Sequence, residues 1–274
     1  MKKLLAVVLI GILALSVFAG CGKTDDVAVD YSQSVAGAKI VAEAGSAGES
    51  LATEDAFFAD AEFTPVDSMA KALMEVEAGT ADIAIVDYVT SIGSIGEGTD
   101  YTDLAVVEGQ DFSPEEYGIA FRKGSDLTAA VNEAIAALMA DGTMDTIAKD
   151  YKLDALLIKD GAANDDAVTE CDLAYIKEKG ELTIGITLFA PMNYNYENGK
   201  LIGFETEFAE AVCEKLGVKA NFVEINWDTK EVELNSKNID CIWNGMTITE
   251  DRLSNMSISV PYMQNKQVMV SKAK

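Results

Sequence analysis

A weak internal repeat limits the folds available to this chain. Segments 69–88 (MAKALMEVEAGTADIAIVDY) and 228–246 (DTKEVELNSKNIDCIWNGM) share a polar helical pattern, a short turn, an acidic residue and an apolar strand. Asp82 aligns with Asp240, and Asp87 aligns with Gly245. We therefore expect two halves of similar build, each with a strand whose carboxyl end carries functional residues.

Strand and helix patterns alternate along the chain. Apolar runs predict strands at 39–42 and 82–86, and a capping box at 46–49 opens a helix. Helices are also predicted at 67–78 and 126–140, the second capped by Asp126 and ended by Gly142. This alternation is typical of α/β folds with mostly parallel sheets flanked by helices. Ligands of such folds gather at the carboxyl ends of the strands, which predicts a cleft between the two halves.

The first 20 residues are typical of a secretory signal peptide. Two lysines precede the apolar run 4–18, which is shorter than the roughly 20 residues of a membrane span. Ala19-Gly20-Cys21 resembles a lipobox, so we expect lipidation at Cys21 and an extracytoplasmic protein anchored to a bacterial cell membrane. An ordinary signal peptide is the alternative. Residues 21–37 are polar and lack apolar periodicity, as in a tether.

Composition excludes several classes of function. The formal net charge is −25, which repels nucleic acid, and the chain has no histidine. Histidine-based triads and the commonest zinc ligand are therefore absent, and we expect no metal and no cofactor. The spacing of Cys171, Cys213 and Cys241 matches no zinc motif. Cys213, on the apolar face of a predicted helix, and Cys241, in an apolar strand, are interpreted as small buried hydrophobes, although one disulfide among the three cysteines is the alternative.

The segment after the second repeat strand is suited to binding a carboxylate. Asn244 and Gly245 follow the strand, Thr247 offers a hydroxyl, and Thr249 is expected to cap a helix that carries Arg252 in its first turn. An arginine beside backbone N–H groups can bind a carboxylate with two parallel hydrogen bonds. The alternative is a surface arginine on a solvated helix.

The other half offers a complementary pair of features. Ser46, Ala47 and Gly48 open a helix, whose free N–H groups and dipole favour a small anion. Asp87 follows an apolar strand and is placed to accept an ammonium group, or else it is a solvated loop aspartate. Carboxylate donors facing an ammonium acceptor predict a zwitterionic ligand, such as a free polar amino acid.

Five motifs together resemble the polar amino-acid family of ABC-transporter substrate-binding proteins, of the type 2 periplasmic-binding-protein class. They are LIGFETEFAEAVCEKLG, NIDCIWNGMTITEDR, VAEAGSAGES, ADIAIVDY and EEYGIAFRKGSDL…ALMADGTMDTIAKDY. The resemblance implies two lobes joined by crossing strands, with a hinge and a central cleft that closes over the ligand. It also implies delivery of the ligand to an ABC permease by a protein that we expect to be a monomer.

The resemblance assigns roles to individual residues. It implies that Arg252, Thr247 and Gly245 hold the α-carboxylate, with help from the N–H groups of 46–48, and that Asp87 takes the α-ammonium. An aromatic clamp on the ligand side chain would consist of Phe189 and Trp227, with core packing as the alternative.

Two positions of the motifs bear on the choice of ligand. The first strand ends in Ile186-Thr187 where many relatives carry an acidic or polar residue, which weakens the case for a basic ligand. Glu43, where some relatives have Lys or Gln, favours a positive or amide group instead. The ligand therefore stays open.

The motifs stand in reversed order relative to the family, which indicates a circular permutation. Remnants of tandem domains that pair with another chain are the alternative. The predicted divisions are 1–20 (signal peptide), 21–37 (tether), 38–117 (ammonium-binding lobe), 118–264 (carboxylate-binding lobe, with the permutation linker near 154–171) and 265–274 (crossing strand).

A substrate-binding lipoprotein without catalytic residues is the function that these features favour. An enzyme of the same fold, such as a dehydratase of cyclic dicarboxylates, would need a carboxyl group with a raised pKa, for which Glu43 is the candidate. An amino-acid sensor is a third hypothesis.

Overall fold

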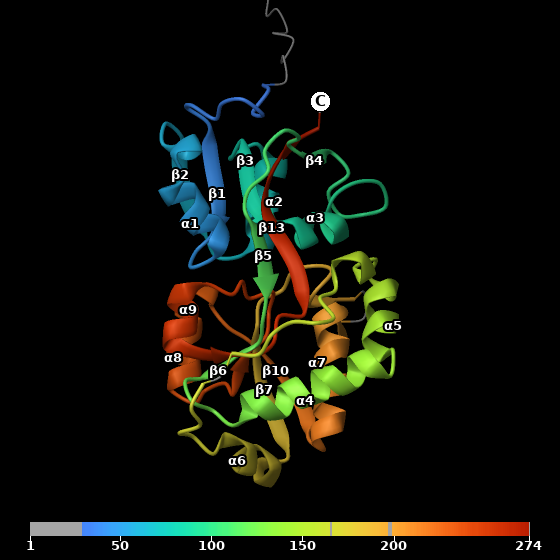
Figure 1. Ribbon diagram of the computed structural model, residues 1–274. Helices are drawn as coiled ribbons and strands as arrows, with labels where there is room; N and C mark the ends of the chain where they lie inside the picture. The colour runs from blue at the N-terminus through green and yellow to red at the C-terminus, as the bar shows by residue number, and fades with distance from the viewer. Residues whose placement is uncertain (1–28, 165, 197–198, 274) are drawn as a thin grey trace, which may run out of the picture.

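The fold consists of two α/β lobes, one above the other (Figure 1). The computed structural model describes residues 29–164, 166–196 and 199–273. We call the lobe built on β1–β5 and β13 the upper lobe, and the lobe built on β6, β7 and β10–β12 the lower lobe. The predicted fold class, sheets flanked by helices in two lobes, is confirmed.

The upper lobe has the sheet order β2-β1-β3-β13-β4, with β5 paired to one end of β13. Its strands are β1 (Lys39–Glu43), β2 (Glu62–Val66), β3 (Ile83–Asp87), β4 (Leu104–Val106), β5 (Pro114–Tyr117) and β13 (Met263–Lys272). Its helices are α1 (Ala47–Glu54), α2 (Met69–Ala78) and α3 (Tyr88–Ser94), with a 3₁₀ turn at Ala56–Phe58.

The lower lobe has the sheet order β10-β7-β11-β6-β12. Its strands are β6 (Ala120–Arg122), β7 (Glu181–Ile186), β10 (Lys219–Glu224), β11 (Cys241–Ile242) and β12 (Met256–Ile258), beside the hairpin β8 (Tyr194–Asn195) and β9 (Leu201–Ile202). Its helices are α4 (Leu127–Ala140), α5 (Thr143–Asp150), α6 (Asp172–Lys179), α7 (Phe204–Leu216), α8 (Lys230–Asn235) and α9 (Glu250–Asn255), with 3₁₀ turns at Asp154–Leu156 and Trp227–Thr229.

Each sheet is completed by a strand that arrives from the other lobe. In the upper lobe, β13 lies antiparallel between β3 and β4. In the lower lobe, β6 lies antiparallel between β11 and β12. The crossing segments pair with each other where β5 meets the first residues of β13. Because every other pairing in the two main sheet paths is parallel, the two lobes have the same topology.

The internal repeat is present in this topology. The Lys39 amide donates to Oδ2 of Asp82 at 2.8 Å, and the Thr183 amide donates to Oδ2 of Asp240 at the same distance. Asp82 stands just before β3 and Asp240 just before β11, and each satisfies an N–H group of the neighbouring parallel strand, β1 or β7. The alignment of Asp82 with Asp240 therefore marks equivalent positions.

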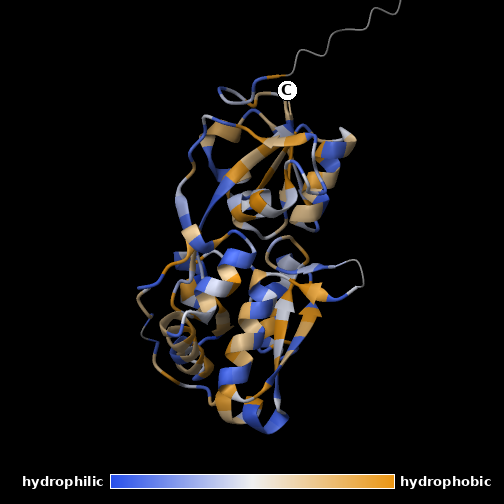
Figure 2. Ribbon diagram, turned by 90° about the vertical axis from the view of Figure 1, so that its right-hand side faces the viewer, coloured by the Kyte–Doolittle hydropathy of each residue, from blue (hydrophilic) through white to orange (hydrophobic). Residues whose placement is uncertain are grey.

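Both faces of each sheet are buried, as the continuous apolar runs of the strands predict. On β3, Ile83 and Ile85 pack on the face that carries α1, whereas Ala84 and Val86 belong to the larger core beneath α2. Figure 2 shows apolar residues gathered along the strands and mixed hydropathy along the helices. Cys213 and Cys241 are buried thiols without a disulfide, as expected.

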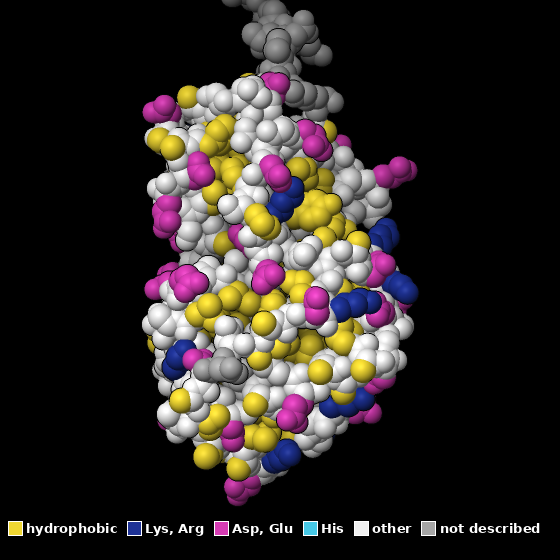
Figure 3. Space-filling model, in the orientation of Figure 1, with side chains coloured by type: hydrophobic (Ala, Val, Ile, Leu, Met, Phe, Trp, Pro, Cys, Tyr) yellow, Lys and Arg dark blue, Asp and Glu magenta, His cyan; other side chains and the backbone are white. Residues whose placement is uncertain are grey.

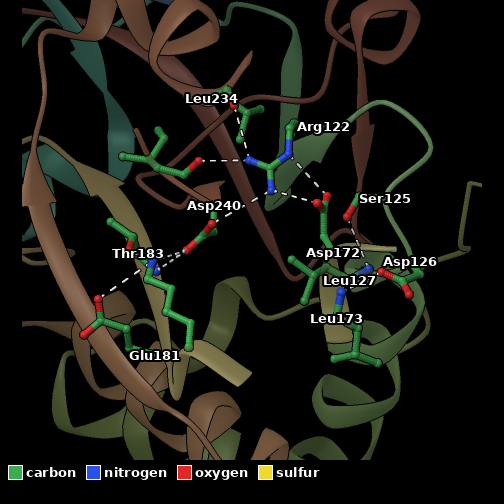
Figure 4. A network of polar contacts seen from close by, with 12 residues as sticks. Arg122, Ser125, Asp126, Leu127, Asp172, Leu173, Glu181, Thr183, Leu234 and Asp240 are labelled. Atoms are coloured by element: carbon green, nitrogen blue, oxygen red, sulfur yellow. Dashed lines mark hydrogen bonds and ion pairs between the residues drawn. The ribbon is translucent and has the colours of Figure 1, made fainter. Parts of the chain in front are cut away.

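A buried ion network ties the linker to the lower sheet (Figure 4). Arg122 on β6 contacts Asp172 at the start of α6 at 3.1 Å and lies 3.8 Å from Asp240. Its Nη1 also donates to the carbonyls of Leu234 and Ile239. The connection from α5 to α6 therefore stays on one lobe, where the N–H of Leu173 donates to Asp126.

Several local predictions agree with the structure, and one is wrong in its detail. The 46–49 capping box forms, and Gly79 ends α2 in a left-handed conformation. Asp126 does occupy the N-cap position of α4, but its side chain makes no capping bond there because it accepts from α6. Gly142 lies just after the C-cap in a left-handed conformation, so it ends α4 as predicted, and it is also the N-cap of α5.

The described ends of the chain both lie on the upper lobe (Figure 1). The Gly37 amide donates to the Asp60 carbonyl, and the Ala273 amide donates to the Asp103 carbonyl. Tyr31 and Val35 pack into the upper core, so the last part of the predicted tether is folded against this lobe. The signal peptide, Cys21 and Lys274 fall outside the described residues.

Replacing Arg122 with methionine tests the buried network. The change keeps an apolar stem but leaves Asp172 buried without its cation, so we expect the free energy of unfolding to fall by about 3–5 kcal/mol. Urea denaturation measures this loss. The control is Lys215→Met, which removes a cation from an exposed pair with Asp141 and should barely move the midpoint. Equal losses in the two variants would contradict the assignment.

Candidate functional site

A cavity of about 1480 Å³ lies between the lobes. The upper lobe contributes residues along the whole length of α1, Tyr88, and residues of the crossing strands β5 and β13. The lower lobe contributes residues 228–231 and the segment 247–252. Among the predicted site residues, the cavity is lined by Ser46, Ala47, Thr247 and Arg252.

The N-terminus of α1 faces this cavity through a well-formed capping box. The Glu49 amide donates to Ser46 Oγ at 3.2 Å, and Glu49 Oε2 accepts from the Gly45 amide at 2.6 Å. Gly45 has a φ of +70°, and a Cβ there would lie 3.0 Å from Cα of Asp228. Only glycine therefore allows the two lobes to approach each other this closely.

Arg252 reaches across the cavity from the lower lobe. Thr249 caps α9 as predicted, accepting from the Arg252 amide at 3.2 Å. The guanidinium is 8% exposed; its Nη1 donates to the Thr247 carbonyl at 2.7 Å, and its Nη2 donates to the Gly45 carbonyl at 3.1 Å. The hypothesis of a solvated surface arginine is thus wrong for this structure.

Lys230 is a site residue that the sequence analysis missed. It begins α8, is 5% exposed, and lines the cavity beside Arg252. Its Nζ donates to the carbonyls of Gly45 (2.9 Å) and Trp227 (3.1 Å) and lies 4.8 Å from the centre of the Trp227 ring. Burial, followed by the charge of Arg252, lowers the pKa of Lys230 to about 8. Its place three residues after Trp227 was the available signal.

Asp87 lies behind the cavity in a network of crossing-strand residues. It accepts hydrogen bonds from Tyr117 Oη at 2.6 Å and from Gln267 Nε2 at 2.5 Å. Burial, and then the nearby charge of Glu115, raises the pKa of Asp87 to about 7. Glu115, in turn, does line the cavity and accepts from Thr247 Oγ1 at 3.0 Å. Of these two carboxylates, Glu115 lines the cavity and Asp87 does not.

The two predicted clamp residues are buried beside the cavity. Phe189 is 3% exposed and Trp227 is 4% exposed, and neither lines the cavity in this conformation. A Cβ on Gly245 would lie 2.9 Å from Phe189 Cζ, so Gly245 is where the aromatic ring meets the backbone. Their contact with a ligand side chain stays a prediction.

Asn244 and Gly48 determine how the backbone segments around the site pack. The Asn244 side chain exchanges hydrogen bonds with the backbone of Thr187 at 2.9 Å, which fixes the end of β7. A Cβ on Gly48 would lie 3.1 Å from Gln267 Oε1 and 3.2 Å from the Ile85 carbonyl. Gly48 is therefore needed for the packing of α1 on the sheet.

Glu43 is a buried carboxyl group at the end of β1. It is 2% exposed, and its Oε1 has no hydrogen-bond partner within the described part of the chain. Burial, and then the charge of Asp87, raises the pKa of Glu43 to about 8, so the group is mostly protonated at neutral pH. It does not line the cavity.

The described residues offer no cluster of three or more His, Cys, Asp or Glu side chains that could hold a metal ion. On the face seen in Figure 3, acidic side chains are spread over both lobes and the cations stand among them. Within the same described ranges, no helix is long and apolar enough to cross a bilayer.

Two lobes joined by two crossing strands, with a cavity between them, define the architecture of a two-lobe periplasmic binding protein. Residues 182–274 match the family model of bacterial extracellular solute-binding proteins, family 3.

Curated relatives share this part of the chain. The chain is 36% identical over 99 residues to the L-cystine-binding protein TcyJ of Escherichia coli K12, which covers 35% of this chain and 37% of that protein. It is also 36% identical over 125 residues to the L-cystine-binding protein TcyA of Bacillus subtilis 168, covering 43% and 46%. Each match thus spans less than half of the relative's length.

A solved structure, the arginine-bound form of domain 1 from TmArgBP in a mutant, is 31% identical, with a TM-score of 0.33. The match covers 36% of this chain and 84% of that domain.

Glu43→Gln tests the buried carboxyl group. Because its pKa is raised on folding, Glu43 stabilises the fold most at low pH, and this contribution is lost as pH rises from about 5 to about 8. Over that window, the free energy of unfolding of the wild type should fall by up to about 1.4 kcal/mol per pH unit relative to the variant. Denaturation at several pH values measures the difference. Exposed Glu54→Gln is the control, and parallel curves for Glu43→Gln and wild type would contradict the prediction.

Proposed function

We propose that this chain is an extracytoplasmic solute-binding lipoprotein that captures a polar α-amino acid and delivers it to an ABC importer. The observation that carries the proposal is Arg252, a buried guanidinium in a cavity between two lobes, bonded only to backbone carbonyls. Such a group is suited to a carboxylate, which binds a guanidinium through two charge-assisted hydrogen bonds.

The ligand is held from both sides of the cavity. The α-carboxylate lies between Arg252 and the N-terminal amides of α1, where the helix dipole also favours a negative charge. The α-ammonium lies toward Asp87 and Glu115 on the upper lobe. Because the ligand contacts both lobes, it binds the closed form more tightly and shifts the population toward it.

Without a ligand, the two lobes contact each other through the Gly45 carbonyl, and the ligand would replace this contact. The Gly45 carbonyl accepts from Arg252 and from Lys230, both on the lower lobe. A ligand carboxylate is a stronger partner for these cations than a neutral carbonyl. Ligand entry therefore exchanges one set of lobe-to-lobe contacts for another, while the hinge at 117–120 and 258–263 adjusts.

In this proposal, the reversed order of the motifs relative to the family results from a circular permutation. Both described ends lie on the upper lobe, and the linker from α5 to α6 packs on the lower lobe, with Asp166 contacting Lys123 and Ser257. Light scattering of the purified protein should give a monomer that binds one ligand per chain. A dimer with one site per two chains would favour the tandem-remnant hypothesis instead.

The lipid anchor and the permease complete the proposal. Cys21, outside the described residues, carries the lipid, so the tether leaves from the upper lobe. Two relatives are named for L-cystine, which therefore belongs in the ligand screen together with the common amino acids. A ligand that binds the native state raises the melting temperature, so a thermal-shift screen identifies it.

The enzyme hypothesis has one specific observation in its favour. Glu43 has the raised pKa that a general acid would need. Its burial outside the cavity lining separates it from a substrate in the closed form. Turnover of prephenate-like compounds that is lost in Glu43→Gln would support an enzyme, and binding without turnover would support the transport function.

Arg252→Ala tests the site directly. The ligand carboxylate would lose its charged partner in a desolvated cavity, so we expect amino-acid affinity to fall by about 2–5 kcal/mol by calorimetry. Lys266→Ala is the matched control because Lys266 lines the same cavity but is already paired with Asp111 at 2.8 Å. Unchanged binding in Arg252→Ala would rule out this assignment.

A further inference from the structure

Three cationic side chains are buried within the described residues, and they differ in their partners. Arg122, Lys230 and Arg252 are 5–8% exposed. Arg122 has two carboxylates within 4.0 Å, as most buried cations require. None of the ion pairs among the described residues joins Lys230 or Arg252 to a carboxylate within 4.0 Å. Both of these cations face the cavity.

The two unpaired cations are close together. The Gly45 carbonyl oxygen lies 2.9 Å from Lys230 Nζ and 3.1 Å from Arg252 Nη2, so the two nitrogens are at most about 6 Å apart. One neutral carbonyl balances neither charge. The carboxylates of Glu231, Glu43 and Asp228 act on Lys230 only from beyond 4.0 Å. The site thus has more positive charge at this wall than one carboxylate needs.

Acidic groups elsewhere in the cavity do not cancel this excess. Most of the other acidic residues that line the cavity are exposed, so water and salt screen them: Glu54, Asp55, Glu116, Asp228 and Asp251. Glu49 and Glu231 are partly exposed, and neither forms an ion pair with Lys230 or Arg252 among the described residues. Glu115 is engaged by the amides of Asn265 and Gln267 on the upper side. The cavity therefore has two cations on one wall and Glu115 on the other, with Asp87 buried behind Glu115.

This charge pattern matches one class of amino acid. We propose that Lys230 is a specificity residue that binds a second carboxylate, so that the preferred ligand is a dicarboxylic α-amino acid. The α-carboxylate binds Arg252, the second carboxylate binds Lys230, and the ammonium binds the acidic wall. The inference rests on the proposed function, because it assigns a ligand class to the same cavity.

Paired ligands of equal size give the test. Calorimetry compares L-glutamate with L-glutamine and L-aspartate with L-asparagine, since each pair differs only by a carboxylate or an amide. The wild type should bind the acid at least tenfold more tightly than its amide. Lys230→Met should weaken acid binding at least tenfold and change amide binding less than threefold.

A matched control and a stability measurement separate ligand binding from structure. Lys266→Met removes another cavity cation, already paired with Asp111, and should preserve the preference for the acid. Ligand-free Lys230→Met should melt no lower than the wild type, because a buried unpaired charge is replaced by an apolar side chain. A lower melting temperature with unchanged ligand preference would assign Lys230 a structural role and overturn the inference.

The remaining outcomes distinguish this inference from the proposed function. Equal losses for acid and amide would mean that Lys230 and Arg252 share one carboxylate, and they would overturn the second-carboxylate assignment while leaving the transport function intact. If the wild type binds amides through Arg252 as tightly as acids, the second-carboxylate assignment is also overturned and the transport function is again left intact. A wild type that binds none of these amino acids, L-cystine or the other common amino acids would overturn both.

Discussion

The reciprocal exchange of strands between the lobes is the constraint on which the rest of the structure depends. Since β13 completes the upper sheet and β6 completes the lower one, neither lobe has a complete sheet without the other half of the chain. The crossing strands also bring Glu115 to the cavity, and Gln267 joins it to Asp87 by donating to both carboxylates. The hinge and one wall of the site are thus the same two segments.

The buried cations far from the cavity and those at the cavity differ in their partners. Far from the cavity, Arg122 is neutralised by Asp172 and Asp240, and its network fixes the α5–α6 connection to the sheet (Figure 4). At the cavity, Arg252 and Lys230 keep their charges without a carboxylate and share the carbonyl of Gly45. Desolvating unpaired cations is costly, and their presence at one wall is the reason that we propose an anion-binding role for it.

Local signals allowed much of the fold to be predicted from the sequence. The Ser46 capping box, the Gly79 helix end and the equivalence of Asp82 with Asp240 depend on neighbouring residues or on a repeated pattern, and all three are present. Arg252 was found because its cap and preceding glycine stand within one motif.

Contacts between distant segments were the part that the sequence could not supply. The side chain of Asp126 bonds to α6, 47 residues further along, rather than to its own helix. Lys230 was missed because its burial depends on Gly45, 185 residues away, and Glu115 because its partners lie on the crossing strand 150 residues later. Such pairings depend on tertiary contacts between segments that are distant in the sequence.

A crystal structure of the protein grown with the amino acid that gives the largest thermal shift tests the central claim most directly. We predict one ligand between the lobes, with its α-carboxylate within hydrogen-bond distance of the Arg252 guanidinium and the Arg252–Gly45 contact replaced. A ligand bound elsewhere, with Arg252 still on the Gly45 carbonyl, would contradict the account.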